Sequence, residues 1–301
     1  MKKSLNYEQT IKKVGWVTII WNLILTVVKA AVGVLGGSTA MISDALHSGS
    51  DVFTTIIVMV GAKISGKESD EAHAYGHERF ESIASIFLGL LLAGTALFIG
   101  YDGIVKIIEY TPVANSSNQF TFLALLGAGL SIVVKGVMFF YTNNHAKKIN
   151  STSLKADAWH HLSDSLSSIG SMLGIIGLMI GKGWQIADPI AAIIICLIIL
   201  KVAYDIIKTA VDQLVDKSIS KELENEIKDK IQDCMGVKGI GSFMSRQFGV
   251  KIYLEVEVYL DENISFSDAD KISIKIHDII EKEYSSVKHC SIYAKPYVEK
   301  N

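Results

Sequence analysis

Cysteine and proline are scarce in this chain, and its acidic and basic residues nearly balance. The 301 residues include three cysteines without paired spacing and three prolines, which excludes a disulfide scaffold and a proline-rich linker array. The net charge of −2 offers no basic footprint for nucleic acid. Charged residues amount to 20%, below the roughly 25% that is usual in soluble domains.

Apolar residues are correspondingly abundant. They make up 50% of the chain, and the mean hydropathy is +0.34, which excludes a disordered chain and indicates a membrane protein. A helix needs about 20 apolar residues to cross a bilayer. Six segments reach that length, and the polar amino terminus does not resemble a cleavable signal. These segments cover approximately residues 14–36, 38–62, 80–108, 120–142, 157–181 and 186–208.

The lysines and arginines predict the orientation of these segments. They cluster before the first segment, between the second and third, and between the fourth and fifth, whereas the opposite loops (37, 109–119 and 182–185) contain only Lys182. Positive residues accumulate on the cytoplasmic side. We therefore expect a multi-pass protein of the cell membrane, with both termini in the cytoplasm.

The composition changes after residue 212, and we divide the chain into a membrane domain (1–212) and a cytoplasmic domain (213–301). Residues 220–234 form an amphipathic pattern, and 250–260 alternate apolar and polar residues as a half-buried strand does. Ser267 and Asp270 resemble a capping box before a second helix. With further strands near 239–247 and 287–294, the order is α-β-β-α-β. We expect a small α+β domain with an antiparallel sheet backed by helices.

One motif occurs twice in the membrane domain. Residues 44–51 and 157–164 both read D-A-x-H-x-x-S-D. On a helix, offsets of three and seven residues keep these side chains on one face. A charge at the bilayer centre costs at least about 2.5–3.5 kcal/mol. Two imidazoles and two carboxylates would suit a tetrahedral Zn²⁺ ion. The four candidate ligands are His47, Asp51, His160 and Asp164.

The two motif helices run in opposite directions through the membrane. Face to face, His47 would lie level with Asp164, and Asp51 with His160, around a midplane site. The alternative is a buried polar network that only joins the helices. For Asp44 and Asp157, a purely structural role in helix packing and a role in supporting the metal ligands or the ion pathway are equally compatible with the sequence. His161 points about 100° away from His160 and is interpreted as a bystander.

A second group of candidate ligands lies between the second and third segments. Asp70, His73 and His77 follow the spacing D-x-x-H-x-x-x-H. Metal binding and an ordinary solvated acidic loop are equally compatible with this spacing. His277 and His289 stand alone in the sequence, and we interpret both as ordinary histidines without a metal.

Together these residues resemble the cation diffusion facilitators. The resemblance covers nearly the whole chain and is carried by SDALHSGSD, AHAYGHERFES and DAWHHLSD. It implies a homodimeric six-helix exporter that exchanges divalent metal for protons, with a ferredoxin-like cytoplasmic domain. Carried over residue by residue, it assigns transport to the two His-Asp pairs and a second site to the loop. Of the positions that match the family's cytoplasmic metal ligands, only Glu257 and Asp270 could ligate a metal.

The leading hypothesis is therefore a secondary transporter that exports Zn²⁺ in exchange for protons. The chain lacks the G-x-x-x-x-G-K-[ST] nucleotide motif, so an ion gradient should supply the energy, and we expect no organic cofactor. The alternatives are a membrane metal sensor, which would need an output domain, and an intramembrane metalloenzyme. A zinc protease of that kind would need HExxH, which neither histidine motif contains. We therefore expect that the protein is not an enzyme.

Overall fold

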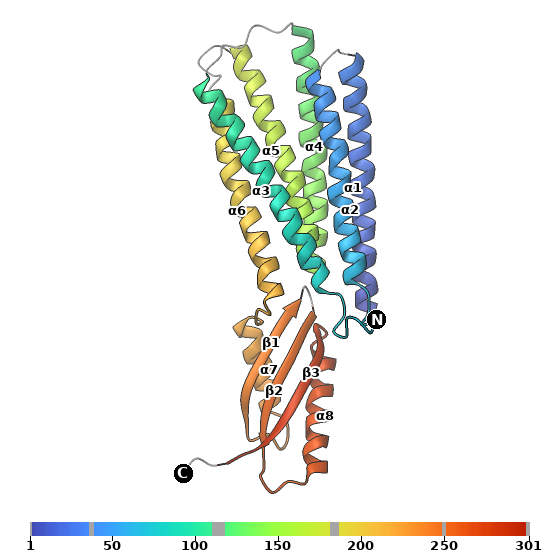
Figure 1. Ribbon diagram of the computed structural model, residues 1–301, viewed down its shortest axis with the longest axis vertical. Helices are drawn as coiled ribbons and strands as arrows, with labels where there is room; N and C mark the ends of the chain where they lie inside the picture. Colours follow the sequence, from blue (N-terminus) through green and yellow to red (C-terminus); the bar gives the residue numbers. More distant parts are fainter. Residues whose placement is uncertain (1, 36–38, 110–117, 181–186, 249–250, 299–301) are drawn as a thin grey trace. The chain divides into compact units, whose positions relative to one another are not determined.

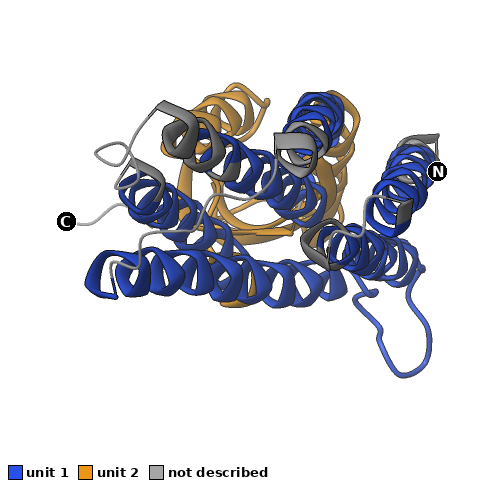
Figure 2. Cartoon of the chain, turned by 90° about the horizontal axis from the view of Figure 1, so that it is seen from above, with its two compact units in different colours: residues 1–211 blue, residues 212–301 orange. Residues whose placement is uncertain are grey.

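The computed structural model describes residues 2–35, 39–109, 118–180, 187–248 and 251–298 (Figure 1). The chain forms two compact units, residues 1–211 and 212–301, which Figure 2 colours separately. The loops on which the predicted orientation depends contain residues 36–38, 110–117 and 181–186. These lie outside the described residues, as does Val250 of the predicted strand.

Long helices build unit 1. Within the described residues they number six and run in chain order as α1 to α6. The first begins twelve residues before the predicted apolar segment, because apolar length marks the membrane-embedded part of a helix and not its end. The fourth likewise continues past residue 142 and stops before Asn150, whose φ of 47° ends the helix. Their bounds are Lys2–Leu35, Thr39–Ser65, Arg79–Ile108, Asn118–Ile149, Thr152–Ile180 and Ala187–Leu214.

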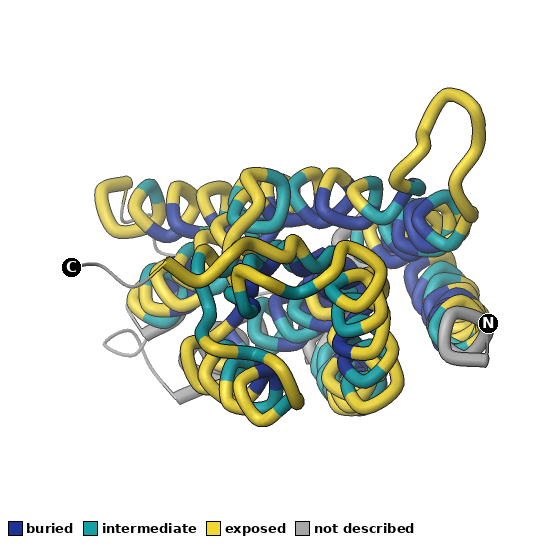
Figure 3. Tube along the Cα trace, turned by 90° about the horizontal axis from the view of Figure 1, so that it is seen from below, coloured by how far each residue is buried: buried dark blue, intermediate teal, exposed yellow. Residues whose placement is uncertain are grey.

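Five of these helices are long and apolar enough to cross a membrane. In the described part of the chain, α1, α2, α3, α4 and α6 meet that criterion by length and composition. The fifth helix carries the second D-A-x-H-x-x-S-D motif in its first half. Large apolar side chains such as Val27, Phe98, Val137 and Leu197 are exposed on the outer faces. Figure 3 shows these alternating exposed and buried faces, which suit a lipid environment.

Small residues let α3 approach its neighbours closely. A Cβ added at Gly100 would lie 2.6 Å from Sγ of Cys196 on α6, and one added at Gly61 of α2 would lie 2.8 Å from Cβ of Ala84 on α3. Glycine at such contacts replaces side-chain bulk with backbone packing, as is common between membrane helices. Leu88, Leu92 and other buried residues of α3 share one core with residues of α6.

Unit 2 contains the predicted α-β-β-α-β order. Its core includes Ile227 of α7, Val256 of β2 and Ile276 of α8. The central strand buries Ile252, Leu254, Val256, Val258 and Leu260 on the predicted face, but Tyr253 of the opposite face is buried too, so the alternation is not strict. The elements are α7 (Lys221–Gln232), β1 (Gly239–Phe248), β2 (Lys251–Leu260), α8 (Phe266–Glu283) and β3 (Val287–Pro296).

Two predictions for unit 2 are wrong. The sheet is mixed, with order β1-β2-β3: β1 and β2 are antiparallel, but β2 and β3 are parallel because α8 carries the chain back across the sheet. The helix cap lies two residues earlier than predicted. Ser265 accepts from the backbone N–H of Asp268 and donates to its carboxylate, and its extended φ and ψ of −66° and 149° are those of an N-cap.

Candidate metal centre

The two repeated motifs face each other across α2 and α5. Nε2 of His47 lies 3.4 Å from Oδ1 of Asp164, and Nε2 of His160 lies 3.1 Å from Oδ1 of Asp51. This is the cross-pairing predicted for antiparallel helices. His160 also lies 4.0 Å from Oδ2 of Asp164, so the two pairs form one continuous group. Ligands of a tetrahedral zinc ion lie about 3.3 Å apart, given bonds of about 2.0–2.1 Å.

The four side chains differ in their access to the surroundings. The side chains of Asp51 and Asp164 are 1% and 7% exposed, and that of His160 is 11% exposed. His47 is half exposed, at 50%. The group is thus closed around its carboxylates and open on the side of His47. This arrangement could admit a cation past one imidazole to two buried negative charges.

Sequence reasoning missed a fifth member of this group. Lys135 of α4 is buried, and its Nζ donates to Asp51 and, over 2.9 Å, to Oδ2 of Asp164. The ammonium therefore joins the two carboxylates that the metal hypothesis needs. The missed signal is a single lysine in the middle of the apolar run LSIVVKGVMFF. A lone charge in such a run is expected to face a partner inside the bundle.

The first aspartate of each motif has its own partner. Nζ of the buried Lys29 lies 2.9 Å from Oδ2 of Asp44 and donates to Ser48 over 3.0 Å. Oδ1 of Asp157 accepts from Thr55 over 3.2 Å, and Oδ2 lies 3.6 Å from Nε2 of His161. Asp157 and His161 are fully buried. His161 is therefore buried beside the aspartate one turn earlier, and its interpretation as a bystander of the metal site stays a prediction.

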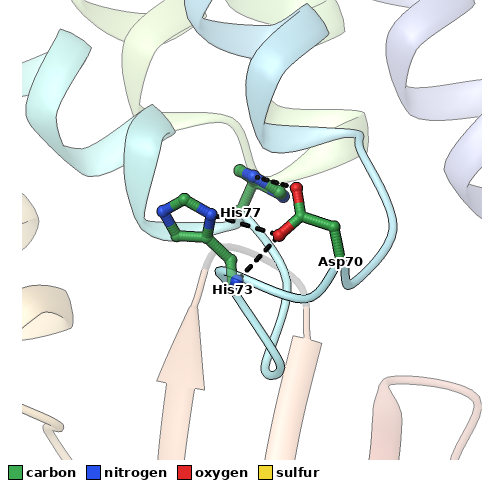
Figure 4. A group of neighbouring side chains, drawn as sticks. All are labelled: Asp70, His73 and His77. Atoms are coloured by element: carbon green, nitrogen blue, oxygen red, sulfur yellow. Dashed lines mark hydrogen bonds and ion pairs between the residues drawn. The ribbon is translucent and has the colours of Figure 1, made fainter.

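The loop residues also come together, as Figure 4 shows. Oδ1 of Asp70 accepts from the backbone N–H of His73 over 2.7 Å and lies 3.3 Å from Nδ1 of that ring. Oδ2 lies 3.4 Å from Nε2 of His77. The two imidazole centroids are 4.4 Å apart. Gly76, with φ of +93°, allows the tight turn that returns the chain to α3.

The electrostatics of this loop favour a cation. The backbone hydrogen bond from His73 holds the pKa of the Asp70 carboxyl below its usual value, so the carboxylate stays ionised. His77 is buried, and among the described residues its Nδ1 finds no hydrogen-bond partner. A buried ring nitrogen without a partner is costly and calls for an explanation. The three residues can supply one carboxylate and two imidazoles to a divalent metal.

The two candidate ligands of unit 2 do not form such a group. Oε1 of Glu257 accepts from Nζ of Lys295 over 2.6 Å, which lowers the pKa of the glutamate. Among the described residues, neither Glu257 nor Asp270 belongs to a group of three potential ligands. The structure instead brings together His277, Glu281 and His289, which sequence reasoning had left apart. The spacing H-x-x-x-E on α8 was the available signal, since it places two ligands on one helix face.

Comparison with known proteins agrees with both units. The family profile of the cation efflux transmembrane domain matches residues 15–215, and that of the cation efflux protein cytoplasmic domain matches residues 219–297. An uncharacterized transporter of Methanocaldococcus jannaschii is 37% identical over 88% of this chain and 91% of its own length. The manganese efflux system protein MneP of Bacillus subtilis is 32% identical over 97% of this chain and 98% of its own. The magnetosome protein MamB of Magnetospira sp. is 31% identical over 94% of both.

These matches exclude the metalloenzyme alternative, because the family consists of transporters. The pairing of His47 with Asp164 and of His160 with Asp51 lies inside the matched transmembrane domain. The chain therefore belongs to the cation diffusion facilitators, a family of membrane-embedded cation efflux transporters.

Proposed function

We propose that this protein exports Zn²⁺ from the cytoplasm in exchange for protons, with His47, Asp51, His160 and Asp164 as the transport ligands. The observation that carries the proposal is the double His-Asp pairing between α2 and α5. A network that served only to join the helices would not need two imidazoles and two carboxylates in one group. Four protein ligands of this kind complete a tetrahedral zinc site.

Charge supports a divalent cargo. The two buried aspartates would cancel the charge of a bound M²⁺ ion, which reduces the cost of holding it in a low-dielectric bundle. Lys135 already contacts both carboxylates. Its ammonium occupies the same negative field that a metal would use, so metal entry requires that this contact open. Lys135 thus acts as a tethered counter-ion of the two aspartates.

Proton exchange follows from the ligand chemistry. An imidazole binds metal only through a deprotonated nitrogen, and free histidine has a pKa of about 6.5. Metal and proton therefore compete for the same ring nitrogens of His47 and His160. A protein that alternates between metal-bound and protonated ligands can couple metal export to proton entry. The lysine-rich loops, which we expect on the cytoplasmic side, support a topology in which this export runs out of the cytoplasm.

The loop site has an auxiliary role in this proposal. Asp70 and His73 are exposed, so a metal can bind there without the desolvation that the membrane site demands. The loop joins α2, which carries two transport ligands, to α3. We place the protein in the cell membrane as a homodimer, as the family resemblance implies.

Mn²⁺ is the second candidate cargo. It is favoured by the similarity to MneP, a manganese efflux system protein. The ligand set favours Zn²⁺, because imidazole is a borderline ligand and Mn²⁺ prefers oxygen-rich, six-coordinate sites. Competitive uptake of Zn²⁺ and Mn²⁺ into inverted membrane vesicles distinguishes the two.

In that assay we expect Zn²⁺ uptake that excess Mn²⁺ does not suppress. Asp51→Ala should abolish uptake, whereas Asp205→Ala, which removes an exposed carboxylate of α6, should retain it. Preferential Mn²⁺ uptake would replace zinc with manganese as the cargo. Uptake of either metal by Asp51→Ala at the wild-type rate would contradict the assigned site.

A further inference from the structure

The contact between α8 and β3 in unit 2 holds a group of side chains that the transport proposal does not use. His277 and Glu281 are four residues apart on α8, and His289 lies on β3. They are the ligand-type residues of a three-member group whose donor atoms all lie within 4.8 Å of one another. The unit's sequence contains two histidines, and both are here.

The distances within the group fit one small cation. Oε1 of Glu281 lies 3.4 Å from Nε2 of His277 and 3.4 Å from Nδ1 of His289. Neighbouring ligands of a tetrahedral zinc ion are about 3.3 Å apart, from bonds of about 2.0–2.1 Å. Two edges of the tetrahedron are therefore already in place. The side chains are 30–59% exposed, so a hydrated ion can reach them and keep water in the remaining position.

Backbone contacts to Cys290 orient two of the three ligands. Nδ1 of His277 donates to the carbonyl of Cys290 over 2.7 Å, which leaves the lone pair of the neutral ring on Nε2, facing Glu281. Oε1 of Glu281 accepts from the backbone N–H of Cys290 over 3.1 Å. Metal-binding histidines usually donate their second ring nitrogen to such a partner, which fixes the tautomer.

We propose that His277, Glu281 and His289 form a binding site for a first-row divalent cation such as Zn²⁺, separate from the transport and loop sites. An imidazole, a carboxylate and a second imidazole are the ligand set of open zinc sites that keep a water molecule. The site connects α8 to the edge strand, so its occupancy would stabilise the packing between these two elements. Unit 2 would then bind metal through these three residues, and Glu257 and Asp270 would not be ligands.

A count of bound metal tests this site in the purified full chain. Equilibrium dialysis against Zn²⁺ should give one fewer bound ion per chain for His289→Gln than for the wild type. Glu281→Gln should lose the same ion. Glu262→Gln, which removes an exposed carboxylate of the same unit, should lose none. Equal zinc content in the wild type, His289→Gln and Glu281→Gln would overturn the proposal.

A combined variant separates this site from the transport site. Asp51→Ala should lose one ion on its own, and Asp51→Ala with His289→Gln should lose two. If Asp51→Ala keeps its zinc while His289→Gln loses one, the transport assignment fails and this site stands. If the double variant loses no more than Asp51→Ala, this site fails and the transport assignment stands.

Unfolding of unit 2 must be distinguished from loss of a ligand. The Cys290 side chain is fully buried, so alkylation of its thiol reports unfolding. His289 is the most exposed of the three ligands, and its replacement should leave Cys290 protected. Zinc loss with Cys290 still protected supports the site. Zinc loss that occurs only together with alkylation of Cys290 would show a structural role and would overturn it.

Discussion

Lys135 places a covalently attached cation beside both carboxylates that the proposed cargo requires. With neutral histidines, the side chains of this group carry two negative charges and one positive charge. A bound divalent ion would make the total positive if the ammonium stayed. A buried excess charge is costly. Binding and release of metal should therefore be linked to the movement of this side chain away from Asp51 and Asp164.

Replacement of Lys135 tests that linkage. Lys135→Met should tighten Zn²⁺ binding by about tenfold or more, because the metal no longer competes with the ammonium; tenfold corresponds to about 1.4 kcal/mol. Lys135→Arg keeps the charge and should keep the weaker affinity. Isothermal titration of the purified variants measures the difference. An unchanged affinity in Lys135→Met would show that the lysine is only a structural partner of the aspartates.

His47 is expected to govern the choice of metal. His47→Asp gives the site three carboxylates and one imidazole, a harder ligand set that discriminates less against oxygen-preferring ions. The variant should still transport Zn²⁺ and should shift the preference toward Mn²⁺ or Cd²⁺ by about tenfold, or about 1.4 kcal/mol.

Paired-metal uptake into inverted vesicles measures this preference. The exposed position of His47 makes the exchange feasible without a new buried cavity. A wild type that already carries Mn²⁺ as readily as Zn²⁺, or a variant whose preference does not move, would place selectivity elsewhere in the pathway.

At the scale of single residues, the sequence predicted those site residues that helix periodicity and the cost of a buried charge can identify. The repeated Asp-His-Asp spacing was enough to pair His47 with Asp164 and His160 with Asp51. Lys135 was not predicted as a member of the site, because a hydropathy average spreads its single charge over a whole apolar segment. The grouping of His277 with His289 was not predicted for a different reason. Their proximity depends on how α8 packs against β3, which no local sequence pattern encodes.

The loop between α2 and α3 is the element where metal binding should modulate transport. Its ligands are held by contacts within the loop, chiefly the hydrogen bonds that Asp70 accepts from the backbone of Ala72 and His73. His73→Ala combined with His77→Ala should lower Zn²⁺ flux several-fold without abolishing it, because the membrane site remains intact. Glu71→Gln, an exposed neighbour, is the matched control.

Zinc flux in vesicles, together with a zinc-soaked structure, checks the loop prediction. Electron density for an ion should appear between Asp70, His73 and His77. If no ion appears in the loop at saturating zinc and the double variant keeps full flux, the prediction is wrong and the loop is an ordinary solvated acidic loop.

The contact between α3 and α6 offers a test of helix packing. A Cβ at Gly100 would lie 2.6 Å from Sγ of Cys196, whereas one at Gly94 of the same helix would meet no atom of the described residues within 4 Å. Gly100→Val should therefore destabilise unit 1 by roughly 1–3 kcal/mol through overpacking. Gly94→Val should be nearly neutral by comparison. Thermal unfolding of both variants in detergent measures the difference, and equal melting temperatures would contradict this packing.

The helices and strands themselves could be predicted from the sequence better than the way in which they pair and pack. Alternating apolar residues predicted the central strand, and apolar length predicted the long helices to within a few turns. The parallel pairing of β2 with β3 could not be read from either strand, because it depends on the path of α8 between them. The cap at Ser265 was placed two residues late, since Ser265 with Asp268 and Ser267 with Asp270 follow the same S-x-x-D spacing.

At the scale of the whole molecule, the chain divides its chemistry between two units. Unit 1 holds buried carboxylates and histidines inside a bundle with an apolar exterior, and unit 2 is a small α+β domain with its own core. Composition alone predicts such a division, because charge and strand periodicity begin where the last apolar segment ends. Which metal is transported could not be derived in the same way, since relatives of similar sequence include a manganese efflux protein.

Coupled flux through the purified protein tests the central claim most directly. In sealed proteoliposomes, Zn²⁺ uptake and the internal pH would be followed together with two fluorescent indicators. We predict that zinc entry is accompanied by proton exit, that an opposing pH gradient slows it, and that Asp164→Ala shows neither movement. Zinc flux that leaves internal pH unchanged, or flux through Asp164→Ala near the wild-type rate, would contradict the account.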